Sequence, residues 1–196
     1  MPRLFSGIEI PEELQDTLSD LEMPLPGARW IEADDLHLTL RYAGDIDNAR
    51  ARDFADALAA IDHDVFDITI AGVGVFGGND PRALWAGIED SEALTNLARA
   101  HERAARAAGL DPEPRAFRPH VTLARMRNTR AEAVAHFLQR HGTFRLPPLT
   151  VERFVLFSSR PQVGGGPYGV VEIFPLRGAS PAAHLFADEM EQDRWR

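Results

Sequence analysis

The chain has 196 residues, a net charge of −9 with histidine neutral, and no cysteine. The acidic balance argues against a protein that grips long nucleic acid through its phosphates, and the lack of cysteine excludes disulfides, thiolate metal sites and thiol nucleophiles. All 21 basic residues are arginine, which also excludes an enzyme–lysine nucleotide intermediate. No apolar run approaches the roughly 18–20 residues of a membrane span, and no signal segment opens the chain, so we expect a cytoplasmic protein.

The pattern along the chain predicts short strands alternating with helices. Pro11 and the acidic residues after it suit the first turn of a helix, and Ser91 is placed as the N-cap of another. Strands broken by helices in a short chain favour an α+β fold. In chain order we predict a strand at 3–10, a helix at 12–21, a strand at 37–40, a helix at 48–61, strands at 65–76 and 82–89, a helix at 91–109, a strand at 120–123, a helix at 129–139, a strand ending at Phe157, and a closing strand at 168–176 after a glycine turn at 164–166.

A second copy of the pattern begins about 80 residues after the first. Residues 84–94 match residues 4–14 at six of eleven positions. His37-Leu-Thr-Leu recurs as His120-Val-Thr-Leu at an offset of 83, and the ends of the long strands, Phe76-Gly-Gly and Phe157-Ser-Ser, align at an offset of 81. Ordered matches at nearly constant spacing indicate an internal duplication.

This duplication predicts the architecture. We expect a bilobal molecule in which two antiparallel sheets, related by a pseudo-twofold axis and covered by outer helices, enclose a central cleft. The repeats span about 3–76 and 83–157 within one domain, 1–177. Residues 178–196 read as a C-terminal tail with an amphipathic pattern at Leu185, Phe186 and Met190.

The repeated tetrapeptide carries the candidate chemistry. Successive side chains of a strand point to opposite faces, so His37 and Thr39 share one face, as do His120 and Thr122. The apolar residues between them point into a core. A single His-x-Thr occurs easily by chance, but two copies at matching positions of a repeat put the same pair on both walls of one cleft.

Two histidines and two hydroxyls suit the cleavage of a phosphodiester. One neutral imidazole takes a proton from water while an imidazolium gives a proton to the departing ribose oxygen. The threonine hydroxyls donate hydrogen bonds to the non-bridging oxygens, where charge builds in the transition state. The histidines could alternatively hold a metal, but threonine is a poor ligand and neither motif contains a carboxylate, so we expect no metal and no cofactor.

Other residues are weaker candidates. Arg125 is the nearest guanidinium to the second motif and could clamp a phosphate, but a regular strand would turn it away from His120, so this role requires a bulge or a strand end. Aromatic rings at Phe5, Trp30 and Phe117 could stack on a nucleobase or belong to the core. The histidines outside the motifs are expected at the surface, at positions 63, 101, 136, 141 and 184.

The chain resembles the 2H phosphoesterases, and most closely the RNA 2′,3′-cyclic phosphodiesterases formerly called 2′-5′ RNA ligases (LigT-like). The resemblance runs from Arg3 to about Leu176. It is carried by Arg3-Leu-Phe, Trp30 ahead of the first motif, Phe76 to Trp85, Phe117-Arg-Pro-His-Val-Thr-Leu-Ala-Arg125, and Gly166-Pro-Tyr168. One departure is Arg41-Tyr42 after the first motif, where relatives more often carry an aliphatic or aromatic pair.

The resemblance implies a bilobal fold and metal-independent hydrolysis of RNA 2′,3′-cyclic phosphate ends to 2′-phosphomonoesters. It also implies that His37 is the proton donor and His120 the acceptor. The expected ligand is an RNA end or a nucleotide 2′,3′-cyclic phosphate, bound by a monomer without a membrane partner. Two alternatives stay open: a related enzyme acting on another small phosphate, such as ADP-ribose cyclic phosphate or an RNA 3′ end, and a non-catalytic nucleotide-binding module.

Overall fold

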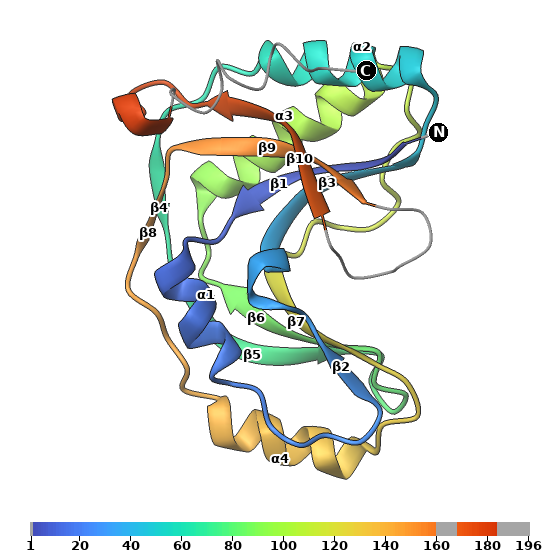
Figure 1. Ribbon diagram of the computed structural model, residues 1–196, viewed down its shortest axis with the longest axis vertical. Coiled ribbons are helices and arrows are strands. Elements are labelled where there is room, and N and C mark those ends of the chain that lie inside the picture. Colours follow the sequence, from blue (N-terminus) through green and yellow to red (C-terminus); the bar gives the residue numbers. More distant parts are fainter. Residues whose placement is uncertain (1, 160–167, 184–196) are drawn as a thin grey trace.

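The computed structural model describes residues 2–159 and 168–183, which form a mixed α+β fold (Figure 1). A short 3₁₀ turn, Ala33–Asp35, precedes β3. In chain order the elements are β1 (Arg3–Glu9), α1 (Glu12–Ser19), β2 (Ala28–Trp30), β3 (His37–Asp45), α2 (Asn48–Ala59), β4 (Phe66–Ile68), β5 (Ile70–Phe76), β6 (Ala83–Ile88), α3 (Glu92–Ala107), β7 (His120–Met126), α4 (Ala131–His141), β8 (Leu149–Val151), β9 (Arg153–Ser159) and β10 (Tyr168–Pro175).

An antiparallel sheet runs the length of the molecule in the order β10-β9-β1-β3-β7-β6-β5, with β2 added beside β7. Among the described residues, the central strands β3 and β7 pair through Leu38 and Val121 alone. This pair divides the sheet into an upper half, β10-β9-β1-β3, and a lower half, which contains β7, β6, β5 and β2 (Figure 1). The two strands that carry the histidines therefore meet at the centre.

The sheet has pseudo-twofold symmetry about this centre. Leu38 and Val121 are 83 residues apart, the offset of the two motifs, so equivalent residues face each other. The small sheet formed by β4 and β8 repeats the relation, because Asp67 pairs with Thr150 at the same offset. Antiparallel strands that pair through equivalent residues lie across a twofold axis.

Each half of the sheet combines strands from both repeats. The third strand of the first repeat, β5, pairs with β6 of the second repeat, and β9 pairs in the same way with β1. The sequence pattern suggested one sheet for each repeat and does not reveal this exchange.

The register also corrects the alignment of the long strands. Leu84 pairs with Val75 and Leu4 pairs with Ser158, so β5 and β9 correspond at an offset of 83. The offset of 81, which matched two phenylalanines, is wrong. Phe157 instead corresponds to Gly74, where a Cβ atom would lie 2.1 Å from the Trp85 ring. The larger indole of Trp85 takes the room that a side chain at Gly74 would need.

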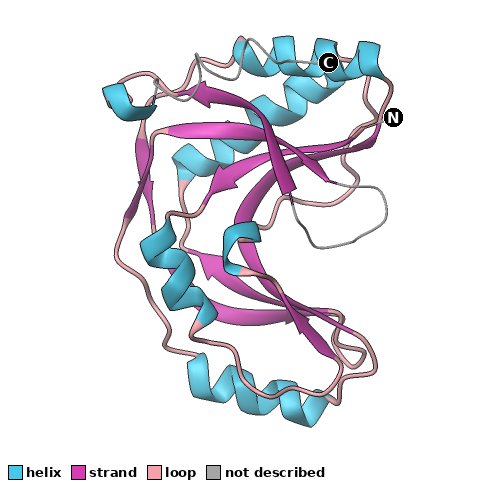
Figure 2. Ribbon diagram, in the orientation of Figure 1, coloured by secondary structure: helices cyan, strands magenta, loops and turns pink. Residues whose placement is uncertain are grey.

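Helices cover one face of each half (Figure 2). In the upper half α2 and α3 pack on each other and α3 packs on β3, whereas α4 packs on β5 in the lower half. Two helices begin with side-chain caps: Asp47 accepts a hydrogen bond from the Arg50 N–H, and Ser91, as predicted, accepts one from the Leu94 N–H. The main core lies between these helices and the sheet, and it includes the apolar residues of both motifs.

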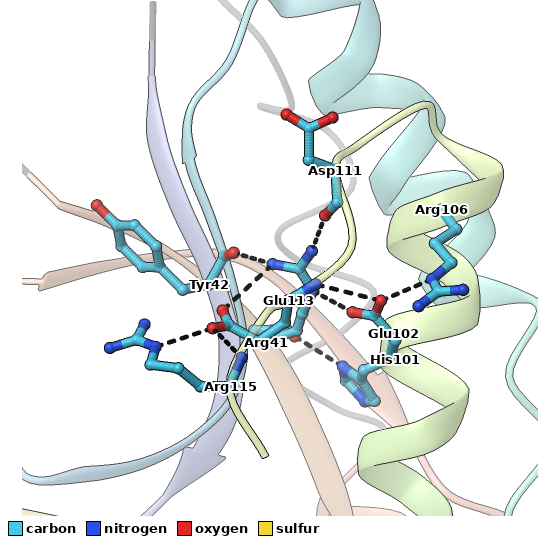
Figure 3. A network of polar contacts seen from close by, with 9 residues as sticks. Arg41, Tyr42, His101, Glu102, Arg106, Asp111, Glu113 and Arg115 are labelled. Carbon is cyan, nitrogen blue, oxygen red and sulfur yellow. Dashed lines mark hydrogen bonds and ion pairs between the residues drawn. The ribbon is translucent and has the colours of Figure 1, made fainter. Parts of the chain in front are cut away.

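Arg41 anchors the first motif strand to α3 (Figure 3). Its side chain is 7% exposed, and its Nε donates a hydrogen bond of 2.6 Å to Glu102. The same guanidinium donates to the carbonyls of Tyr42 and Asp111 and lies 4.0 Å from the Glu113 carboxylate. These contacts satisfy a charge that would otherwise be costly to bury, and they fix β3 immediately after its histidine and threonine.

Several predicted boundaries differ from the structure. The strand expected at 65–76 is interrupted at Thr69, because β4 leaves the large sheet to pair with β8. The helix expected at 129–139 is Ala131–His141. The glycine turn at 164–166 and the apolar residues proposed for a tail helix lie outside the described residues.

Candidate active site

The two motif strands present their polar residues on the face of the sheet that is turned away from the helices. Leu38 and Val121 are fully buried in the main core, and the neighbouring His and Thr side chains are half-buried on the opposite face. We call this surface, which carries His37, Thr39, His120 and Thr122, the site face. The alternation of side chains along a strand therefore acts as the sequence predicted.

Both imidazoles are held in the same way. The Nδ1 atom of His37 lies 2.7 Å from the carbonyl oxygen of Asp35, and the Nδ1 atom of His120 lies 2.6 Å from that of Arg118. A carbonyl can only accept, so each Nδ1 carries the proton and donates it. This bond orients each ring and leaves Nε2 to exchange protons with a ligand.

Aromatic rings surround each histidine. The His37 ring centroid lies 4.7 Å from that of Phe5 and 5.5 Å from that of Phe157. His120 has two comparable neighbours, Phe76 at 4.9 Å and Trp85 at 6.3 Å. Tyr168, at 4.9 Å from His37, adds a third ring on the upper half. These walls limit rotation of the imidazoles and reduce their contact with water.

A bulge brings Arg125 to the site face. Thr122 pairs with Trp85 while Ala124 pairs with Leu84, so Leu123 is an extra residue in β7. The extra residue reverses the alternation: Leu123 and Ala124 are both buried, and the exposed Arg125 returns to the side of His120 and Thr122. The bulge required by the sequence argument is therefore present. The first repeat has the same bulge at Leu40, and there Tyr42 takes the place of Arg125.

Burial and the Arg125 guanidinium determine the electrostatics of the site. Burial lowers the pKa of His37, opposed by the Asp35 contact and assisted by the positive charges of Arg125 and His120. Burial also lowers the pKa of His120, again assisted by Arg125. An electrostatic effect of His120 on His37, and of Arg125 on both rings, requires that the three groups lie close together.

The residues two positions before the histidines make the site asymmetric. Asp35 and Arg118 occupy equivalent places, 83 residues apart, and both accept a ring N–H through their carbonyls. Their side chains carry opposite charges. The Asp35 carboxylate is 8% exposed, accepts a hydrogen bond from the Tyr168 backbone N–H and raises the pKa of His37. Sequence analysis missed Asp35 because only its place beside the motif could have marked it.

The proposed stacking residues lie elsewhere or deeper than an open platform would. Trp30 packs against Phe137 of α4, and Phe117 packs against the main core. Phe5 does reach the site, but it is 3% exposed and supports the His37 ring from below. The prediction of a surface position is wrong for His101, which is fully buried and bonded to the Ser6 hydroxyl at 2.7 Å.

Within residues 2–159 and 168–183, no group of three or more histidine, aspartate or glutamate side chains is arranged to hold a metal ion. No helix in the same part of the chain is both long and apolar enough to cross a membrane.

Comparison with known proteins gives consistent matches. The LigT like Phosphoesterase model matches residues 8–85 and 87–168, and each match contains one His-x-Thr motif. An RNA 2′,3′-cyclic phosphodiesterase of Aquifex aeolicus is 31% identical over 89% of this chain and 95% of the relative. A protein of the same name from Geobacillus stearothermophilus is 28% identical over 89% of this chain, which spans 57% of that longer relative.

Solved structures support the same assignment. TT0787 of Thermus thermophilus has a TM-score of 0.70 at 26% identity, over 91% of this chain and all of the other. E. coli LigT, crystallised with 3′-AMP, has a TM-score of 0.73 at 23% identity, over 90% of this chain and 99% of the other, which shows a shared fold. With both halves of its length matched by the family model, the chain belongs to the LigT-like phosphoesterase family.

Proposed function

We propose that this protein hydrolyses the 2′,3′-cyclic phosphate ends of RNA to 2′-phosphomonoesters by a two-histidine mechanism that uses no metal. The observation that carries the proposal is the pair of matching imidazoles, each with Nδ1 bonded to a backbone carbonyl and Nε2 left for proton exchange. Relatives named RNA 2′,3′-cyclic phosphodiesterase support the same substrate.

In the proposed reaction a water molecule attacks the phosphorus atom of the cyclic phosphate. Nε2 of neutral His120 takes a proton from this water as the new P–O bond forms. The bond between phosphorus and O3′ breaks, and Nε2–H of protonated His37 gives its proton to O3′. The products are a 3′ hydroxyl and a 2′ phosphate. Charge that builds on the non-bridging oxygens receives hydrogen bonds from Thr39 and Thr122 and is balanced by Arg125.

The charges beside the histidines support this division of roles. Asp35 raises the pKa of His37 and so favours the protonated donor. Arg118 occupies the equivalent position beside His120, where a positive charge favours a neutral acceptor. Burial and Arg125 lower the pKa of both rings in the free protein. A bound phosphate anion raises it, so the substrate itself helps to protonate His37.

We also infer that residues 1–177 act as one domain, produced by duplication of a unit of about 80 residues. The interlocked strands support a single domain, because neither half of the sheet is built from one repeat. We expect this domain to work as a monomer in the cytoplasm.

The proposal is tested by incubating the purified chain with an oligonucleotide that ends in a 2′,3′-cyclic phosphate, in the presence of EDTA. The expected product is a 2′-phosphomonoester, identified by phosphorus NMR, and the double variant His37→Ala, His120→Ala should form none. A rate that vanishes in EDTA and returns with Zn²⁺ or Mn²⁺ would disprove the metal-independent mechanism. Hydrolysis of ADP-ribose cyclic phosphate alone would identify a different substrate, and tight binding without turnover would identify a binding module.

A further inference from the structure

A second arginine lies beside Arg125. The short strand β2 pairs with β7 where β3 has turned away, and in this register Arg29 is the direct partner of Arg125. The flanking pairs, Ala28 with Met126 and Trp30 with Ala124, place small or apolar residues toward the core. Because side chains alternate, the exposed Arg29 and Arg125 both lie on the site face.

Both guanidinium groups act on the ring that covers His37. The pKa of Tyr168 is raised by burial, and the positive charges of Arg125 and Arg29 oppose this rise. The Tyr168 ring in turn lies 4.9 Å from His37. Arg29 is therefore near the upper wall of the site as well as adjacent to Arg125, although it comes from neither motif.

This arrangement concentrates positive charge at one place on an acidic protein. Like charges on directly opposite residues of an antiparallel pair destabilise a sheet, so the arrangement needs a compensating benefit. The pseudo-symmetry sharpens the point. The positions that correspond to Arg29 and Arg125 in the other repeat are Pro112 and Tyr42, neither of which is cationic. The cationic pair therefore exists on one side of the site only.

We propose that Arg29 and Arg125 form a subsite for a second phosphate, the phosphodiester that joins the reacting terminal nucleotide to the nucleotide before it. This inference rests on the proposed function and specifies its substrate as an RNA end in preference to a free mononucleotide. Arg125, next to His120, reaches the reacting phosphate, and Arg29, one strand away, reaches the next one along the chain. Guanidinium groups suit this task because they bind phosphate through paired hydrogen bonds.

A cationic pair on one side also gives direction to a site whose catalytic groups are nearly symmetric. An RNA strand that enters with its next phosphate toward β2 presents its cyclic phosphate in one orientation. The 3′ oxygen then always faces the same histidine.

The test compares UpA and adenosine, both ending in a 2′,3′-cyclic phosphate, so that the reacting nucleotide is the same. We expect a higher kcat/KM for the dinucleotide. Arg29→Gln should reduce this preference by about tenfold or more, which is the effect of one lost charged hydrogen-bonding contact. It should also reduce the slope of log(kcat/KM) for the dinucleotide against log salt concentration by about 0.7, the contribution of one phosphate on a single strand. Arg103→Gln, an exposed change on α3 of the same charge, is the matched control.

Binding of the unreactive 3′-phosphates UpAp and Ap, measured by calorimetry, separates this inference from the proposed function. Loss of the UpAp preference in Arg29→Gln supports the subsite even if the cyclic compounds are not hydrolysed. If both cyclic compounds are hydrolysed but Arg29→Gln leaves the two preferences unchanged, or weakens both ligands equally, the subsite is disproved and the proposed function stands.

Discussion

The backbone N–H of Tyr168 donates a hydrogen bond of 2.9 Å to Oδ1 of Asp35. This bond ties the start of β10 to the turn that precedes β3, although the two residues are 133 positions apart. It also holds a carboxylate next to His37, and the carbonyl of Asp35 accepts the proton of the imidazole Nδ1. Asp35 therefore positions the proposed donor through its backbone and influences its charge through its side chain.

Replacement of Asp35 by asparagine separates these effects, because the amide oxygen can still accept the Tyr168 N–H. Loss of the negative charge should lower the pKa of His37. The reaction needs His37 protonated, so the alkaline limb of the profile of kcat/KM against pH should move to lower pH while the acid limb stays in place. Asp34→Asn, an exposed change of the same type, should move neither limb. Movement of the acid limb alone would reverse the roles of the histidines.

The two threonines should contribute to the transition state more than to folding. Thr39→Val and Thr122→Val keep the shape and strand preference of the side chain but remove a donor. Each change should reduce kcat/KM about a hundredfold, roughly 3 kcal/mol, with little change in the free energy of unfolding. Thr143→Val, on an exposed turn, is the control. Near-normal rates in both motif variants would mean that the hydroxyls are structural.

Substrates with different leaving groups should distinguish the two histidines. A leaving group of low pKa departs without a proton donor, so a nitrophenyl phosphodiester should restore much of the rate of His37→Ala relative to the natural leaving group. His120→Ala should gain less, because its water still lacks a base. The measurement is the ratio of kcat/KM for the two substrates in each variant. A larger gain in His120→Ala would assign the donor role to His120.

The sequence predicted the elements that depend on local pattern and missed those that depend on distant pairing. The motif strands, their core-facing leucines and the cap at Ser91 follow from alternation and from side-chain chemistry next to the backbone. The need for a bulge before Arg125 was also evident, but its place at Leu123 depends on the register with β6. Arg29 joins the site only because β2 pairs with β7. No local signal identifies such a partner.

His101 shows a similar limit in the core. Its position on a charged helix suggested a surface residue, yet its ring is fully buried against Phe154 and the Ser6 hydroxyl. Burial lowers its pKa to about 3, so the folded protein keeps this imidazole neutral at any ordinary pH. The amphipathic pattern of α3 places position 101 inward, but the pattern alone could not name the serine that would pair with it.

This buried imidazole should make stability depend on pH. The unfolded chain binds a proton near pH 6.5 and the folded chain does not, so the contribution is present above pH 6.5 and is lost as the pH falls. Between pH 7 and pH 5 the free energy of unfolding should fall by about 2 kcal/mol through this residue. Denaturant unfolding at both pH values should show a smaller fall in the double variant Ser6→Ala, His101→Leu. An equal fall in both proteins would mean that His101 becomes protonated in the folded state.

Arg41 should matter to stability and not to chemistry. Arg41→Met removes the partner of a half-buried carboxylate and of two backbone carbonyls (Figure 3). Breaking a buried pair in this way costs about 3–5 kcal/mol. Arg106→Gln removes an exposed partner of the same Glu102 and should cost less than about 1 kcal/mol. Chemical denaturation measures both changes, and similar small losses would show that the Arg41 network contributes little.

The exchange of β5 and β9 between the two halves of the sheet has a consequence for how the protein forms. A chain cut near Gly78 would leave each fragment with its outer strand unpaired and its core open, so neither fragment should fold alone. Mixed together, the two fragments could reassemble by strand complementation. A single ancestral unit would have met the same requirement by pairing with a second copy of itself. The catalytic centre would then have lain on the symmetry axis of a homodimer, with one histidine supplied by each subunit.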